Sequence, residues 1–161
     1  MKEVRSKRGW SYGAYARSSI DRRRQSFSMW TFPAATDAAA CIGLELELLE
    51  KLVEGGVTPR ETAFIKKYLV RSHAFEIDTA AKRLHQRLDA ELLDLPAGYH
   101  EAYVDHVKAV TAEEASAAVK ARLDPKNLLV VVVGTASDIL PAVEKAIPGL
   151  ANSTTRKFDA D

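Results

Sequence analysis

Apolar and polar positions along this chain follow first the period of a strand and then the period of a helix. Between residues 10 and 17 the side chains alternate at the spacing of a strand. Residues 25–33 are rich in aromatic and other strand-favouring side chains, so they predict a second strand, ending at Pro33. Residues 21–24 between them have the length of a hairpin loop. Residues 1–8 predict the last turn of a preceding helix.

From residue 36 the apolar positions recur at helical spacing. Thr36 is the predicted N-cap of a first long helix, with Asp37 in its first turn, and Gly55-Gly56 ends it. The apolar stripe expected to face the core consists of Ile42, Leu46, Leu49 and Val53. Cys41 lies among alanines and Ile42, which favours a small core residue over a reactive thiol.

Two later helices have the sequence signature of a capping box. Thr58 and Glu61 form the first box, with Pro59 at the first helical position. The helix that follows is expected to bury Phe64, Ile65, Tyr68 and Leu69. Thr111 and Glu114 form the second box. We therefore expect helices to begin near residues 59 and 112.

The remaining pattern predicts two helices between these boxes and a strand after them. A helix over residues 78–95 presents Leu84, Leu88 and Leu92, and a short helix covers residues 99–107. Leu128–Val133 is apolar at every position, which predicts a central strand covered on both faces. Ser137 is the expected cap of a last helix, which ends before Pro148-Gly149.

Strands followed by helices predict one α+β domain over residues 1–150, with a mainly antiparallel sheet and helices packed on one of its sides. A polar tail, partly disordered, is expected over residues 151–161. The length of 161 residues, with 47% hydrophobic side chains, suits a single domain. No apolar run approaches the roughly 18 to 20 residues that span a bilayer, so no membrane span is expected. The sequence leaves the compartment open between periplasm and cytoplasm.

The net charge of +1 conceals a basic N-terminal region. Eight basic side chains and two acidic ones fall within residues 1–24, interleaved with Trp10, Tyr12 and Tyr15. Such a mixture can bind single-stranded nucleic acid by neutralising phosphates and stacking on bases. The alternative, which we favour, is a solvated hairpin turn at Arg22–Arg24, because the rest of the chain is acidic. Nucleic acid is therefore not an expected partner.

Arg5 and Tyr12 stand seven positions apart at the start of the chain. They are followed by a helix that ends in Gly55-Gly56, then a Thr-Pro-Arg-Glu helix start, Leu-Pro-Ala-Gly-Tyr, Val-Thr-Ala-Glu-Glu, and the valine run that ends at Gly134. This succession resembles the M16 (pitrilysin and insulinase-like) zinc metallopeptidases, whose domains have the LuxS/MPP-like fold. The resemblance covers nearly the whole chain and corresponds to the C-terminal part of one such domain. It implies an incomplete sheet with an open edge.

M16 peptidases bind zinc through an HxxEH motif, in which two histidines hold the metal and a glutamate acts as base. No HxxEH occurs in this sequence. Its four histidines are His73, His85, His100 and His106, and we expect all four on partly exposed helix surface. His100 and His106 are six residues apart, which places them on opposite faces of a helix. The resemblance is therefore to the non-catalytic (inactive) half of the family, with no cofactor in this chain and zinc in a partner half.

In such proteins two homologous halves close around a peptide, so the resemblance implies a lid half. Its partners would be an HxxEH-bearing half, on the same chain or a separate subunit, and a peptide substrate. The resemblance assigns Tyr12 a contact to the scissile carbonyl and Arg5 a contact to the peptide or to Tyr12. From the residues alone, Tyr12 could instead be a strand residue with its ring in the core and its hydroxyl at the rim, and Arg5 a solvated cation that pairs with a carbonyl at the helix end. The open edge could add an extended peptide or a second copy of the chain. A catalytically inert structural subunit of the same fold remains the main alternative.

Overall fold

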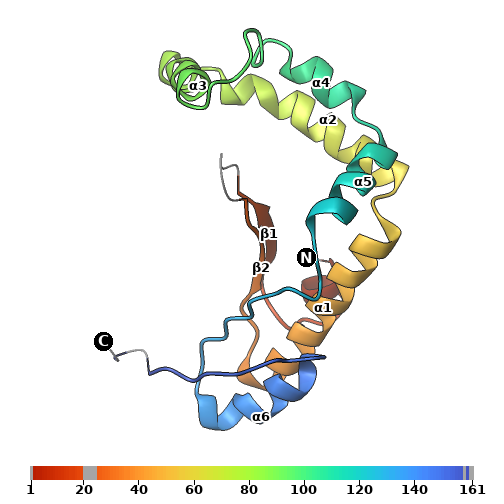
Figure 1. The fold of residues 1–161 in the computed structure, drawn as a ribbon, viewed down its shortest axis with the longest axis vertical. Coiled ribbons are helices and arrows are strands. Elements are labelled where there is room, and N and C mark those ends of the chain that lie inside the picture. Colours follow the sequence, from red (N-terminus) through yellow and green to blue (C-terminus); the bar gives the residue numbers. More distant parts are fainter. Residues whose placement is uncertain (1, 20–24, 158, 160–161) are drawn as a thin grey trace. The chain divides into compact units, whose positions relative to one another are not determined.

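The computed structural model describes residues 2–19, 25–157 and 159 of the chain. The chain divides into two compact units (Figure 1). Unit 1 comprises Met1–Val53 and Leu123–Asp161, and unit 2 comprises Glu54–Arg122. The predicted α+β class is confirmed, because helices accompany a two-stranded antiparallel sheet. None of the described helices is both long enough and apolar enough to cross a bilayer. The single domain predicted over residues 1–150 stays a prediction.

The sheet of unit 1 is a hairpin that follows a short helix. The helix is η1 (Lys2–Ser6), and the strands are β1 (Ala14–Ser18) and β2 (Phe27–Thr31). The register pairs Ala14 with Thr31 and Ser18 with Phe27. Tyr15 and Trp30 are opposite one another in this register, and their rings stack with centroids 5.4 Å apart. The two predicted strands are thus present, and the predicted loop at 21–24 lies outside the described residues.

The first strand begins later than the alternation of residues 10–17 predicted. Trp10 and Tyr12 precede β1, which begins at Ala14. Continuing the observed register would place Tyr12 opposite Pro33, and proline has no N–H to donate to the ladder. The strand pairing therefore stops before it reaches Tyr12.

The long helix of unit 1 begins with a 3₁₀ turn, η2 (Ala35–Asp37), and continues as α1 (Ala38–Gly55). The predicted N-cap at Thr36 is wrong, because Thr36 lies inside the 3₁₀ turn. Ala34 occupies the cap position and makes no side-chain hydrogen bond. The predicted end is confirmed: the helix stops at Gly55, and Gly56 has a φ of +69° that glycine adopts without strain.

The core of unit 1 forms where η1 packs on α1. Val4, Cys41 and Leu44 are buried together, with Trp10, Ala14 and Leu48 packed against them. The helix face buried in this way is not the predicted stripe. Of that stripe only Leu49 is fully buried, because the face is chosen by the residues of η1 and the following loop that cover it. Cys41 is fully buried as expected, and burial raises the pKa of its thiol.

Unit 2 consists of helices α2 (Pro59–Glu76), α3 (Ala80–Leu92), α4 (Tyr103–Ala109) and α5 (Ala112–Arg122). Both predicted capping boxes are present. The Thr58 hydroxyl accepts from the Glu61 N–H at 3.2 Å, and the Glu61 carboxylate accepts from the Thr58 N–H at 2.9 Å. The corresponding distances between Thr111 and Glu114 are 3.1 and 2.8 Å. Local sequence therefore placed these helix starts correctly.

The apolar stripes of unit 2 are largely uncovered, which contradicts the predicted burial. On α2 the side chains of Phe64, Ile65 and Tyr68 are exposed. On α3 the leucines at 84, 88 and 92 are exposed as well. An amphipathic helix buries its apolar face only where another element lies over that face.

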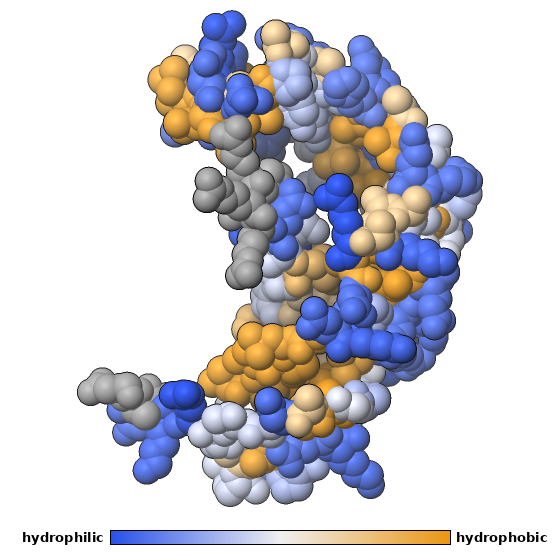
Figure 2. All heavy atoms as spheres, in the orientation of Figure 1, coloured by the Kyte–Doolittle hydropathy of each residue, from blue (hydrophilic) through white to orange (hydrophobic). Residues whose placement is uncertain are grey.

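The third predicted strand, at Leu128–Val133, is not formed among the described residues. Leu128–Val133 pairs with no strand among the described residues and forms no regular element. Its side chains at 129, 131 and 133 are among the most exposed apolar groups of the protein, and Figure 2 shows hydrophobic surface in the region where Figure 1 draws this segment. The last helix, α6 (Ala136–Ala146), follows. Thr135 rather than Ser137 is its N-cap, and Ser137 donates instead to the Asp138 carboxylate.

Candidate functional site: an arginine stacked on an exposed tyrosine

Arg5 and Tyr12 lie together in the folded chain. Arg5 belongs to η1, and Tyr12 lies in the loop between η1 and β1. The guanidinium carbon of Arg5 is 4.5 Å from the centroid of the Tyr12 ring, within the range of a cation–π contact. Tyr12 is 81% exposed, so its ring is held by Arg5 on a surface that solvent and other molecules reach. The structure thus brings the two predicted site residues into contact.

The position of Arg5 follows from its neighbours in η1. Val4 is buried in the core beside Cys41 and Leu44, so it anchors the helix to α1. Arg5, next to Val4 on the chain, is exposed and free to reach the loop. Two backbone bonds then close the turn after the helix, from the Gly9 N–H to the Arg5 carbonyl at 3.0 Å and from the Trp10 N–H to the Val4 carbonyl at 3.1 Å.

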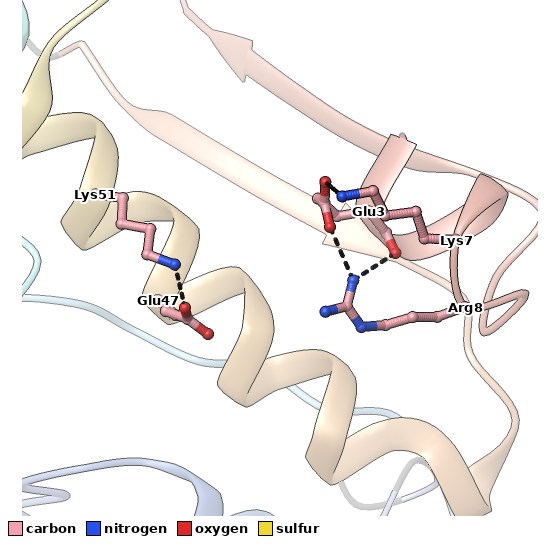
Figure 3. A network of polar contacts seen from close by, with 5 residues as sticks. All are labelled: Glu3, Lys7, Arg8, Glu47 and Lys51. Carbon is pink, nitrogen blue, oxygen red and sulfur yellow. Dashed lines mark hydrogen bonds and ion pairs between the residues drawn. The ribbon is translucent and has the colours of Figure 1, made fainter.

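A cluster of charged side chains stabilises the same helix (Figure 3). Glu3 accepts from the Lys7 ammonium at 2.7 Å and from the Arg8 guanidinium at 3.0 Å. These two cations, Lys7 first and Arg8 second, lower the pKa of the Glu3 carboxyl. Arg8 also donates to the Glu3 carbonyl, so it closes the helix end from two sides. A separate pair, Glu47 and Lys51, lies on α1.

The position of Tyr12 follows from Ser11. The Ser11 side chain is buried, and its hydroxyl donates to the Gly13 carbonyl at 2.7 Å. The same oxygen accepts from the N–H groups of Gly13 at 3.3 Å and Phe32 at 3.1 Å. Ser11 is buried, whereas Tyr12, the next residue, lies at a bend and is exposed. The Ser11 hydroxyl thus accepts from the N–H of Phe32, the residue that follows Thr31, the last paired residue of β2.

Sequence reasoning missed two of these contributors, Ser11 and the stack of Arg8 on Trp10. The Arg8 guanidinium carbon is 5.3 Å from the Trp10 ring centroid, so a second arginine–aromatic contact lies beside the first. The sequence did show arginines close to aromatic residues, because the residues of both arginine–aromatic contacts lie within positions 5–12. What the sequence did not show is that the chain turns back at Gly9, where φ is +68°.

Chemically, Arg5 and Tyr12 offer hydrogen-bond donors to an oxygen atom. A guanidinium has only donors, and a phenol can donate one O–H. Within the described part of the chain, neither the Tyr12 hydroxyl nor the Arg5 guanidinium makes a hydrogen bond. The arrangement therefore suits a peptide carbonyl or another electron-rich oxygen arriving from outside.

The histidines do not join this site. In unit 2, His73 stacks on Tyr103 with centroids 4.7 Å apart, and Tyr99 contacts the rings of His100 and His106 at 5.5 and 6.5 Å. His100 was expected on a helix surface, but it lies in a turn, with its Nε2 atom buried and without a partner. Among the described residues, no three histidine, cysteine or acidic side chains gather closely enough to hold a metal ion.

Two hollows are present in unit 2, and neither is lined by Arg5 or Tyr12. The first, of about 790 Å³, is bordered mainly by apolar side chains of α2, α4 and α5, including Phe64, Ile65 and Val110. The second, of about 760 Å³, is bordered by polar and apolar side chains, among them His73, Arg87 and Leu95. The Arg5–Tyr12 site is thus an exposed surface feature of unit 1.

Two comparisons with known proteins found proteins similar to this chain. No protein-family model matches the chain. The chain is 21% identical over 133 residues to "Non-peptidase homolog YmxG" of Helicobacter pylori, a match that covers 83% of this chain and 31% of that protein. Among solved structures it is similar to a peptidase M16 inactive domain from Pseudomonas fluorescens, with 25% identity and a TM-score of 0.72. That match covers 78% of this chain and 30% of the other.

The chain therefore spans less than a third of the length of either relative. The relative with a solved structure is described as inactive, and the curated relative as a non-peptidase homolog. Both descriptions agree with the resemblance found in the sequence, and the fold agrees with it at the level of backbone geometry. The predicted resemblance is confirmed: the chain is similar in sequence and in backbone fold to part of a peptidase M16 inactive domain.

Proposed function

We propose that this chain acts as the non-catalytic lid half of an M16-type zinc peptidase. In this proposal it supplies substrate and transition-state contacts to an HxxEH-bearing half elsewhere. The observation that carries the proposal is the contact of Arg5 with the exposed Tyr12 ring, because it holds two donors at one accessible point. In this proposal the zinc belongs to the partner half, which carries the HxxEH motif that this sequence lacks.

Tyr12 is the proposed oxyanion contact. When a peptide carbonyl is attacked, negative charge grows on its oxygen, and a donor fixed in place beforehand stabilises that charge. A neutral phenol suits this task because it donates without needing to change its protonation state. Its exposed position allows a substrate held by the partner half to approach it.

Arg5 is the proposed positioning residue. Its guanidinium lies against the Tyr12 ring and limits the ring's freedom, so less ordering remains to be done when the substrate arrives. It also places positive charge beside the growing negative charge on the carbonyl oxygen. The buried Val4 and the Glu3 cluster hold η1, and through it Arg5, in place.

The test is cleavage of fluorogenic peptides by this chain assembled with its HxxEH-bearing half. Tyr12→Phe removes one donor and keeps the ring, so kcat should fall by about 100- to 1,000-fold while KM changes little. Arg5→Lys keeps the charge but loses the planar group that stacks, so it should lower kcat by less than Tyr12→Phe does. Tyr15→Phe is the matched control, because Tyr15 stacks on Trp30 outside the site. A Tyr12→Phe assembly as active as the wild type would remove Tyr12 from the mechanism.

The second candidate function is an inert structural subunit of the same fold. It is favoured by the description of the Helicobacter pylori relative as a non-peptidase homolog. In that case the wild-type assembly would form but cleave no peptide. The same experiment therefore separates the two functions, provided that assembly is confirmed by co-purification before activity is measured.

A further inference from the structure

Gly13, the residue after Tyr12, is held by side-chain hydroxyls. Strand β1 begins at Ala14, so Gly13 lies one residue outside the paired register. Its N–H donates to the Ser11 hydroxyl oxygen at 3.3 Å. Its carbonyl accepts two hydrogen bonds, from the hydroxyls of Ser11 at 2.7 Å and Thr31 at 3.0 Å. A carbonyl oxygen has two lone pairs, so both of them are used.

Thr31 reaches this carbonyl from the other strand. It is the last residue of β2 and lies on the half-buried face of that strand. Its hydroxyl oxygen accepts from the thiol of Cys41 at 4.0 Å, and Cys41 is fully buried. A hydroxyl can accept and donate at once, so it takes this weak S–H donor and gives its own proton to Gly13. Contacts thus run from the buried core at α1 to the loop that carries Tyr12.

A fixed Gly13 matters for Tyr12 because glycine has more backbone freedom than any other residue. Ser11 and Gly13 are both buried, whereas Tyr12 between them is exposed. The Tyr12 ring therefore keeps its place 4.5 Å from the Arg5 guanidinium only as long as the backbone on both sides of it is held. The Thr31 bond ties Gly13 to β2, so the loop cannot pivot about its glycine without breaking that bond.

We propose that Thr31 is a positioning residue for Tyr12. Its hydroxyl fixes Gly13, and Gly13 fixes the backbone that carries the Tyr12 ring to Arg5. Thr31 acts through the backbone, so it changes how often Tyr12 is aligned and not which groups meet a peptide. Its effect on peptide cleavage rests on the proposed function, whereas the contact of Arg5 with Tyr12 can be measured in this chain by itself.

The first test follows the Arg5–Tyr12 contact by NMR. The signals are the cross-peaks between the Arg5 δ protons and the Tyr12 ring, and the upfield shift that the ring gives those protons. Thr31→Val removes the hydroxyl and keeps the branched shape, and valine favours strands as threonine does. It should lower the ratio of stacked to unstacked Tyr12 about 2- to 10-fold, the effect of one hydrogen bond. Thr31→Ser supplies a hydroxyl again and should restore both signals.

Thr62→Val is the matched control. The Thr62 hydroxyl also donates to a carbonyl, that of Thr58, at 3.0 Å, but it lies on α2 in unit 2. Its loss should lower the stability measured by urea denaturation to a similar degree and leave the Arg5–Tyr12 signals as they are in the wild type. A general loosening of the chain is thereby distinguished from a local loss of alignment.

The second test is peptide cleavage by this chain assembled with its HxxEH-bearing half. Thr31→Val should lower kcat about 2- to 10-fold with little change in KM, because the defect lies in alignment. The proposal is overturned if Thr31→Val leaves the NMR signals unchanged, if Thr62→Val weakens them equally, or if Thr31→Ser does not restore them. Loss of the signals in an assembly that cleaves no peptide, even as wild type, would uphold the role of Thr31 and remove the proposed peptidase function.

Discussion

Two apolar regions of unit 1 differ in outcome although the sequence predicted burial for both. Helix α1 alternates apolar residues with glutamates, yet its Cys41 and Leu44 are buried. Leu128–Val133 is apolar throughout, yet three of its side chains are almost fully exposed. The difference is that Val4 and Trp10 cover one face of α1, whereas the described chain places nothing over the bare face of the segment. An apolar side chain lowers the free energy when it is buried, but it is buried only where another part of the protein packs over it.

The same contrast applies to the candidate site. Arg5 follows Val4, which is part of the buried core, and Tyr12 follows Ser11, whose hydroxyl bonds the backbone of β2's continuation. Each exposed functional side chain thus stands next to a buried anchor. The 128–133 segment has no such anchors at its bare positions. Arg5 and Tyr12 each follow a buried residue in the chain, whereas Leu129 and Val131 do not.

The largest effect should come from a matched pair of leucine substitutions. Leu44→Ala removes buried methyl groups from the core and should lower the free energy of unfolding by about 2–5 kcal/mol. Leu129→Ala removes the same atoms from an exposed position and should change it by less than about 0.5 kcal/mol in the monomer. Urea denaturation at low protein concentration measures both. Equal losses at the two positions would mean that Leu129 is covered in solution.

An intermediate effect is expected from Ser11→Ala, which tests the anchor beneath Tyr12. It leaves the Phe32 N–H without its partner and should lower the free energy of unfolding by about 1–3 kcal/mol. Ser28→Ala is the control, because Ser28 is exposed on β2. Both are measured by thermal or urea unfolding. If Ser11→Ala were as stable as Ser28→Ala, water would replace the hydroxyl at no cost and the anchor would be unimportant.

The smallest effect concerns the pH dependence of α1. Burial raises the pKa of Glu45, so the folded state holds this proton more tightly than the unfolded state does. Its contribution to stability is therefore full at pH values below the unfolded pKa and is lost as pH rises through the folded pKa. Glu45→Gln removes this titration, so its stability relative to the wild type should increase over that interval. Because Glu45 is only partly buried, the difference should be about 0.5 kcal/mol.

The measurement is the free energy of unfolding in urea at a series of pH values from 3 to 8, roughly the range in which carboxyl groups titrate. Glu50→Gln is the control, since Glu50 is exposed on the same helix. If the difference between Glu45→Gln and the wild type shrank as pH rose, the sign of the argument would be reversed. Glu45 would then be stabilised in its ionised form.

By itself the sequence determined part of the local structure of this protein, although the helix caps predicted at Thr36 and Ser137 were wrong. The capping boxes at Thr58 and Thr111 and the stop of α1 at Gly55 depend on residues a few positions apart, so they could be predicted. The family resemblance rested on the order of such local motifs and is confirmed by the fold. Arg5 and Tyr12 were named from that resemblance, which also offered a contact between them as one of two roles for Arg5.

The tertiary structure decided what depends on distant partners. Packing against other residues determined which face of α1 is buried. Strand β1 begins at Ala14 because Pro33 ends the pairing. The turn at Gly9 places the Tyr12 ring against Arg5. The tertiary structure also left Leu128–Val133 without a neighbouring strand. The physical reason is that a helix start is stabilised by its own neighbours in sequence. A buried face, a strand and a stacked pair each need a second surface, whose place is known only once the chain has folded.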